Sequence, residues 1–155
     1  MSFRSLRVAL LLLFLIPAGS RAAVLFEEGS SWHWRKGTSE ASTPDTAAWR
    51  QLGFDDSSWA VGPSAFYYGE PLSGTELPDM RGGYTCVYLR KTFVIGSPAD
   101  LSGFRLKALS DDGFVAWING TPVVRFNVPD GDLAYTATAL GALSEPLPTE
   151  TYEIP

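Results

Sequence analysis

The chain has 155 residues, with 12 Lys and Arg against 17 Asp and Glu, so its formal net charge is -5. Aromatic residues make up 13% of the chain, too many for an intrinsically disordered protein, and the length suits one domain. The acidic balance disfavours a nucleic-acid-binding protein, because phosphate contacts need a surface rich in Lys and Arg. We therefore expect one folded domain that binds no nucleic acid.

The start of the chain has the pattern of an export signal. Two arginines precede an unbroken apolar run over residues 8–16, and small residues lead up to Ala22, where cleavage is expected. The run is shorter than the roughly 20 residues that span a bilayer. We therefore expect residues 1–22 to be a signal peptide. Residues 23–155 are then a secreted domain, extracellular, periplasmic or on the cell surface, without a membrane span.

Export leaves a more acidic chain with one cysteine. The signal contains three arginines and no acidic residue, so 9 basic residues remain against 17 acidic ones and the net charge becomes -8. Cys86 is the only cysteine, which excludes an intrachain disulfide. We expect Cys86 to be a small buried apolar side chain rather than a reactive thiol, because it lies in a strand-like run.

Short β-branched and aromatic runs alternate with turn residues along the chain, a pattern typical of all-β proteins. One short helical segment is expected over residues 46–52, and the clearest strands cover residues 84–95, 104–109, 114–118 and 123–127. Asn119-Gly120 predicts a type I′ turn between the last two strands, because that turn needs positive φ at both positions. Asp111-Asp112-Gly113 predicts a second reversal, so the last three strands should form a meander.

The region before these strands is rich in turn residues but contains regularly placed aromatic side chains. These are Trp49, Phe54, Trp59, Phe66, Tyr67 and Tyr68. Loops with so many large apolar groups usually pack over a sheet. We therefore expect an antiparallel β-sandwich with long ordered loops on its N-terminal side.

Three segments resemble the galactose-binding-like jelly roll. They are WRQLGFDDSSW over residues 49–59, YLRKTF over residues 88–93 and SDDGFVAWINGT over residues 110–121. Such modules are non-catalytic sugar-binding domains of glycoside hydrolases. They also occur in large secreted bacterial proteins with lamin-tail or spore-coat-kinase-like domains. The resemblance covers residues 32–140 and implies a jelly-roll fold and a carbohydrate ligand.

The end of the chain departs from this family. Its modules normally continue into closing strands, whereas this chain stops at residues 151–155, where another strand begins. We therefore expect a jelly roll that lacks its last strand or strands. The chain would be the N-terminal part of a longer protein, whose other domains are expected partners.

The sequence has no strong catalytic motif. His33 is the only histidine, and neither a G-x-S-x-G nucleophile elbow nor a phosphate-binding glycine loop is present. Zinc needs several Cys or His ligands, and the mature chain has two such residues. A glycoside hydrolase needs two carboxylates across one cleft, which spacing cannot show. We therefore expect that the protein is not an enzyme.

Candidate sugar-binding residues combine aromatic rings with polar groups, since a ring stacks on the apolar face of a pyranose while polar groups bind its hydroxyls. They are Tyr67, Tyr68, Asp111, Asp112, Trp117, Asn119, Arg125 and Asn127. Trp32 and Trp34 are further candidates expected in loops, whereas Trp49 and Trp59 are expected in the core. Arg125 either lines a concave face with Asn127 or pairs with Asp112 across the hairpin.

Asp111 and Asp112 could also bind Ca²⁺, because paired carboxylates beside a glycine turn supply hard oxygen ligands. The pair is similar to the Asp-Asp pair of calcium-dependent adhesin lectins, although that family's other motifs are absent here. The alternative role is structural, because Asp side chains hydrogen-bond the local backbone in turns.

These observations predict a secreted, non-catalytic module that binds a polysaccharide or glycan, with calcium optional. The alternative is a ligand-free structural spacer or protein-docking domain in a cell-surface assembly. Exposure separates the two hypotheses. Solvent-facing Trp and Tyr beside Asp and Asn favour a sugar ligand, whereas fully buried aromatic rings favour the spacer.

Overall fold

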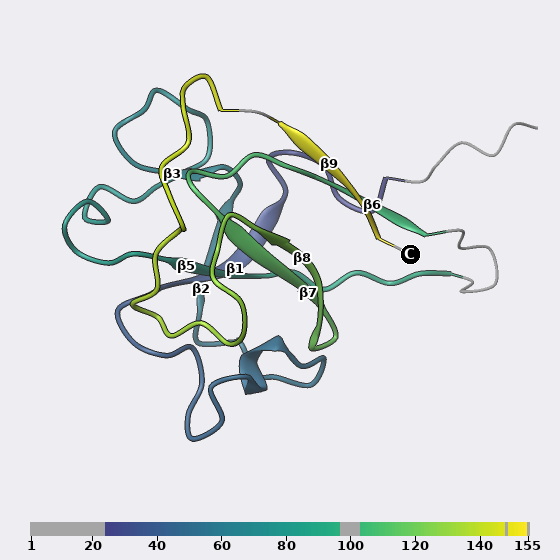
Figure 1. Ribbon diagram of the computed structural model, residues 1–155. Helices are drawn as coiled ribbons and strands as arrows, with labels where there is room; N and C mark the ends of the chain where they lie inside the picture. The colour runs from purple at the N-terminus through teal and green to yellow at the C-terminus, as the bar shows by residue number, and fades with distance from the viewer. Residues whose placement is uncertain (1–23, 97–102, 148, 155) are drawn as a thin grey trace, which may run out of the picture.

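The computed structural model describes residues 24–96, 103–147 and 149–154, and the predicted signal peptide lies outside these ranges. The elements in chain order are β1 (Ser31–Lys36), the 3₁₀ helix η1 (Ala48–Arg50), β2 (Ala60–Pro63), β3 (Phe66–Tyr67), β4 (Thr75–Glu76), β5 (Val87–Arg90), β6 (Phe104–Ala108), β7 (Phe114–Ile118), β8 (Thr121–Phe126) and β9 (Glu150–Ile154). The fold is all-β, as predicted, and η1 lies inside the segment expected to be helical (Figure 1).

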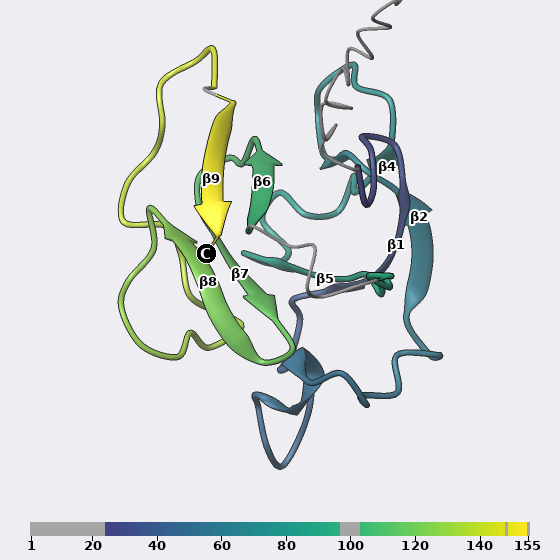
Figure 2. The same cartoon turned by 90° about the vertical axis from the view of Figure 1, so that its right-hand side faces the viewer.

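The described strands pair in four small sheets. β1 lies between β2 and β5 in an antiparallel sheet, while β6 pairs with β9 and β7 pairs with β8, both antiparallel. β3 and β4 form a short parallel pair. Figure 2 shows the β7–β8 pair and β9 on one side of the molecule and β1 and β2 on the other. The antiparallel pairing is confirmed, and a jelly-roll sandwich stays a prediction.

The β7–β8 hairpin has the predicted turn. Asn119 and Gly120 have φ values of 49° and 84°, the positive values that a type I′ turn requires. Beyond the pair of Trp117 and Pro122 the register slips by one residue, so that Ala116 lies opposite Val124. Because side chains alternate between the two faces of a strand, this β-bulge brings Pro122 to the same face as Arg125.

Three details of the predicted strand pattern are wrong. The meander does not form, because β6 pairs with β9 instead of β7. The strand expected over residues 84–95 is limited to β5, and Val94 beyond it is 86% exposed. Trp32 and Trp34, expected in a loop, lie in β1. Alternation identifies extended segments, but the partner of a strand depends on contacts made elsewhere in the chain.

Trp49 and Trp59 are buried in the core, as predicted. The Trp49 ring meets Tyr88 of β5 edge-to-face at 5.0 Å between centroids and Trp117 of β7 at 5.3 Å. Large aromatic rings in such contacts bury much apolar area and supply a large share of the stability of a small domain. The packing of Trp49 fixes η1 beneath the hairpin, and Arg50 follows it directly.

Candidate ligand-binding site

A hollow of about 480 Å³ lies between η1, the β7–β8 hairpin and the loop after β8. It is lined by Arg50, Trp117, Gly120, Pro122, Arg125, Gly131 and Asp132. We call it the hairpin hollow. Its volume falls in the range of about 300–1,000 Å³ that small-molecule sites occupy. Two of the residues predicted from the sequence, Trp117 and Arg125, are among its lining residues.

Local structure explains why these side chains meet. The bulge places Pro122 and Arg125 on the hairpin face that carries Trp117. Gly120 of the turn lies against the residue after η1, because a Cβ there would come within 2.7 Å of the side-chain oxygen of Gln51. A side chain at this turn position would displace the amide end of the Gln51 side chain, and the φ of 84° at Gly120 would strain it in any case.

Arg50 joins the aromatic and acidic parts of the hollow. Its guanidinium carbon lies 4.5 Å from the centroid of the Trp117 ring, a cation–π contact. Its Nη1 donates to Oδ1 of Asp132 at 2.6 Å. The Arg50 side chain is only 10% exposed, whereas that of Asp132 is 75% exposed. The ion pair therefore has one buried and one solvated end.

The charge state of the hollow follows from these contacts. The hydrogen bond from Arg50 and its charge lower the pKa of Asp132, and the nearby Arg125 adds a weaker effect in the same direction. Asp132 is therefore ionised at neutral pH. Two guanidinium groups and one carboxylate leave one net positive charge in the hollow.

Arg125 fixes the loop that carries Asp132. Its Nη2 donates to the carbonyl of Gly131 at 2.7 Å, and its Nη1 donates to the carbonyl of Pro129. Arg125 lines the hollow without Asn127, its expected neighbour there, and among the described residues it makes no ion pair with Asp112.

Asp112 and Asn127 lie at the open end of the hairpin and hold backbone segments together. Asn127 Nδ2 donates to the carbonyls of Asp112, at 3.0 Å, and Gly141, at 2.7 Å. Asp112 Oδ1 accepts a hydrogen bond from the Leu143 amide at 2.8 Å. These contacts attach the loop before β9 to the hairpin, and neither residue lines the hairpin hollow.

Asp111 occupies the same end of the hairpin. A side-chain hydrogen bond with Asp112, together with partial burial and the charges of Asp112, Glu145 and Glu70, raises the pKa of Asp111 to about 6. In the described part of the chain, no group of three or more His, Cys, Asp or Glu side chains is placed to hold a metal ion. Calcium binding by Asp111 and Asp112 stays a prediction.

The other predicted site residues are dispersed. Tyr67 is partly buried in β3, Tyr68 follows it with 41% exposure, and Asn119 is exposed in the hairpin turn. None of the three lines the hairpin hollow. The structure therefore separates the predicted residues into three groups, and only Trp117 and Arg125 lie together at a hollow.

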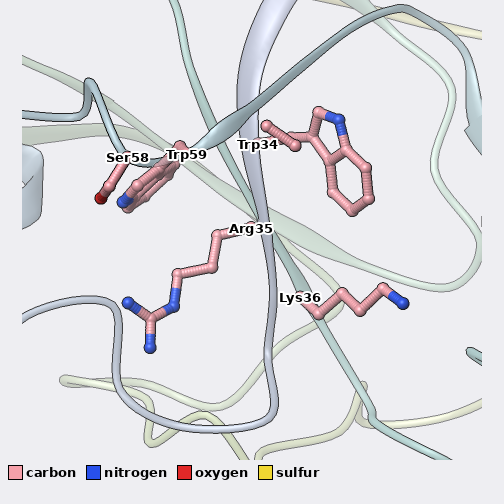
Figure 3. A pocket seen from close by; sticks show the side chains of 6 residues that line it. Trp34, Arg35, Lys36, Ser58 and Trp59 are labelled. Atoms are coloured by element: carbon pink, nitrogen blue, oxygen red, sulfur yellow. The ribbon is translucent and has the colours of Figure 1, made fainter.

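A second hollow of about 320 Å³ is lined by Trp34, Arg35, Lys36, Ser58, Trp59 and Ala60. Figure 3 shows Trp34 and Lys36 on one side of β1 and Trp59 and Arg35 on the other. Trp59 is buried, and the Trp34 ring packs 6.0 Å from that of Phe66. The indoles of Trp34 and Trp59 in this second hollow therefore contribute to packing and do not converge on one ligand.

His33 and Cys86 have structural surroundings. His33 Nδ1 lies 3.1 Å from Oδ1 of Asp56, and Arg90 Nε donates to the other oxygen of this carboxylate at 2.8 Å. The cluster attaches the loop after η1 to β1 and β5. The partly buried Cys86 donates to the Tyr135 carbonyl at 3.3 Å, and burial raises the pKa of its thiol, which disfavours reactivity.

Sequence reasoning missed Pro122 of the hairpin hollow, and it also missed the ion-paired residues Arg50 and Asp132. They are 82 positions apart, so no local spacing connects them. The available signal was the position of Arg50 directly after a core tryptophan, which places a cation at the rim of the aromatic cluster. Asp132 lies in a Pro-Asp-Gly-Asp turn and carried no comparable signal.

Comparisons with known proteins found no match to this chain among protein-family models, curated proteins or solved structures. The galactose-binding-like resemblance therefore stays a prediction. Across the described ranges, no helix has both the length and the apolarity to cross a membrane.

Proposed function

We propose that this protein is a secreted, non-catalytic carbohydrate-binding module and that the hairpin hollow is its sugar site. The observation that carries the proposal is the convergence of an indole, a proline ring and three charged side chains on one open hollow. In chain order these residues are Arg50, Trp117, Pro122, Arg125 and Asp132.

Each part of the hollow has a role in sugar recognition. Trp117 and Pro122 supply apolar surface for the C–H face of a pyranose ring. Arg50 and Arg125 donate hydrogen bonds to hydroxyl or ring oxygens. Arg125 also holds the loop after β8 in place, so this wall of the hollow is formed before a ligand arrives. Recognition then needs no covalent step.

The test is calorimetric titration and thermal unfolding of the purified protein with a panel of plant, algal and bacterial glycans. A ligand that binds only the folded state raises the unfolding temperature by mass action. In Trp117→Leu we expect the affinity for the bound glycan to fall about tenfold, because the stacking surface is lost. Repeating the titration with a chelator tests the calcium prediction for Asp111 and Asp112.

Two matched variants make the result specific. Trp32 is also partly buried, meets Phe26 edge-to-face at 5.2 Å and lies under the Lys91 ammonium, yet it is outside both hollows. Trp32→Leu should therefore leave affinity unchanged, and so should Trp34→Leu in the second hollow. Equal losses in Trp117→Leu and Trp32→Leu would contradict the site. Cooperative unfolding that no glycan shifts would favour the structural spacer.

A further inference from the structure

The electrostatics of the hairpin hollow differ from those of the whole chain. The chain has a net charge of -5, whereas the hollow contains Arg50 and Arg125 against Asp132 alone. The net negative charge of the whole protein repels anions at long range. The positive charge of the hollow therefore attracts an anionic group mainly once that group has entered the hollow. The hollow therefore favours a sugar that carries a negative charge.

The hydrogen-bonding capacity of Arg50 is incompletely used. Its Nε is buried and has no hydrogen-bond partner among the described residues. The contact with Asp132 is made through Nη1. A guanidinium presents five N–H donors in a planar fork, and a carboxylate that meets the fork squarely accepts two parallel hydrogen bonds. A buried donor without a partner is costly, which favours a better-placed acceptor.

Asp132 is the replaceable member of the pair. Its side chain is 75% exposed and lies on a loop, whereas the Arg50 side chain is 10% exposed. A carboxylate that is already mostly solvated loses little hydration when it turns into water. A ligand carboxylate could therefore take the place of Asp132 without disturbing Arg50.

We propose that the hairpin hollow binds the carboxylate of an acidic sugar through Arg50, and that Asp132 occupies the place of this carboxylate in the free protein. The inference rests on the proposed function and adds the class of ligand, a glycan built from uronic acids. Trp117 contacts the sugar ring, Arg50 takes the carboxylate, and Arg125 adds the second positive charge. Asp132 acts as an internal competitor that weakens binding.

The experiment uses calorimetric titration of the purified protein with three matched probes. These are a galacturonic acid trimer, its uncharged methyl ester and a sulfated galactose trimer. We expect the free acid to bind more tightly than the methyl ester, and rising salt to reduce the difference, because the hollow is open to solvent. Tighter binding of the sulfated trimer than of the free acid would overturn the preference for a planar carboxylate.

Two substitutions test the roles of Arg50 and Asp132. Asp132→Asn keeps an oxygen acceptor for Arg50 but removes the competing charge, so affinity for the free acid should rise by about threefold while that for the methyl ester stays the same. Arg50→Gln should lower affinity for the free acid by more than about tenfold. Arg105→Gln is the control, because Arg105 pairs with Glu153 on the β6–β9 sheet.

The outcomes separate the two proposals. Binding of neutral glycans that depends on Trp117, with no gain for the acid and no effect of Asp132→Asn, would overturn the acidic-sugar inference and leave the proposed function in place. No binding of any probe or panel glycan would overturn both. Weaker binding of the free acid by Asp132→Asn would show that Asp132 is a ligand-binding residue and not a competitor.

Discussion

Polar side chains gather in two regions beside the β7–β8 hairpin, and the two regions differ in use. At the open end, Asn127 and Asp112 bond to backbone groups of Gly141 and Leu143. In the hairpin hollow, Arg50 and Asp132 bond to each other, side chain to side chain. Backbone partners are fixed by the chain, whereas an exposed side-chain partner can be exchanged for a ligand.

The kind of hydrogen-bond partner therefore separates structural residues from binding residues of the same chemical type. At the open end, loss of a side chain leaves a backbone carbonyl or amide without its partner, so we expect a cost in stability. In the hollow, loss of a side chain removes a contact that faces solvent, so we expect a cost in affinity. Variants of the hollow should therefore lower affinity, which variants of the open end should leave unchanged.

The largest expected effect is on stability at the open end. Asn127→Ala removes two hydrogen bonds to carbonyls and places alanine at a φ of 50°, so the free energy of unfolding should fall by about 2–3 kcal/mol. Urea denaturation measures this change, and titration with the bound glycan should show unchanged affinity. A loss of affinity without a loss of stability would remove the distinction between the two regions.

Asn119→Ala is the matched control for this variant. Asn119 has nearly the same backbone conformation, with a φ of 49°, and its side chain makes no hydrogen bond to the described residues. Its substitution should cost only the backbone strain, about 1 kcal/mol. The difference between the two variants then measures the hydrogen bonds of Asn127. Equal losses would show that those bonds contribute nothing.

A smaller effect is expected in the hairpin hollow, where Arg125 positions the loop of Asp132. Arg125→Lys keeps the charge but loses the fork that binds the carbonyls of Pro129 and Gly131. The free energy of unfolding should fall by about 1 kcal/mol and glycan affinity by about threefold. Calorimetry and urea denaturation measure the two quantities.

Arg35→Lys is the control for Arg125→Lys. Arg35 donates to Ser39 at 2.6 Å and lines the second hollow, so Arg35→Lys makes the same exchange of side chain at constant charge but leaves the hairpin hollow intact. Glycan affinity should not change. A fall in affinity in both variants would mean that the effect is general and not due to the loop of Asp132.

The fold could be predicted where its signal is local. The Asn119-Gly120 turn and the burial of Trp49 follow from dihedral preference and ring size, and both were predicted. The pairing of β6 with β9 joins residues 104–108 to residues 150–154, and the pattern of neither strand names its partner. The sequence therefore predicted strands better than sheets.

The candidate site could be predicted only on the hairpin itself. Trp117 and Arg125 were predicted as a ring and a cation on the two hairpin strands, but regular alternation from the turn would place them on opposite faces, and only the β-bulge brings them to the same one. Arg50 comes from η1 and meets Asp132 only because Trp49 packs beneath the hairpin. That meeting is a tertiary contact, and residue spacing contains no information about it.

The smallest expected effect tests whether the acidic open end is a structural region under charge repulsion. The folded state raises the pKa of Asp111 from 3.8 to about 6, so it binds this proton more tightly than the unfolded state does. The resulting contribution to stability is fully present below pH 3.8 and is lost as the pH rises through about 6.

Asp111→Asn cannot titrate at this position, so its stability relative to the original protein should increase across this interval. The change should be well below 1 kcal/mol, because Asp111 is exposed and screened by solvent. Urea denaturation of both proteins at the two ends of the interval measures it, with glycan affinity expected to be the same in both. A relative stability that stays constant would mean that Asp111 and Asp112 do not share a proton, and the repulsion that distinguishes this end from the hollow would be absent.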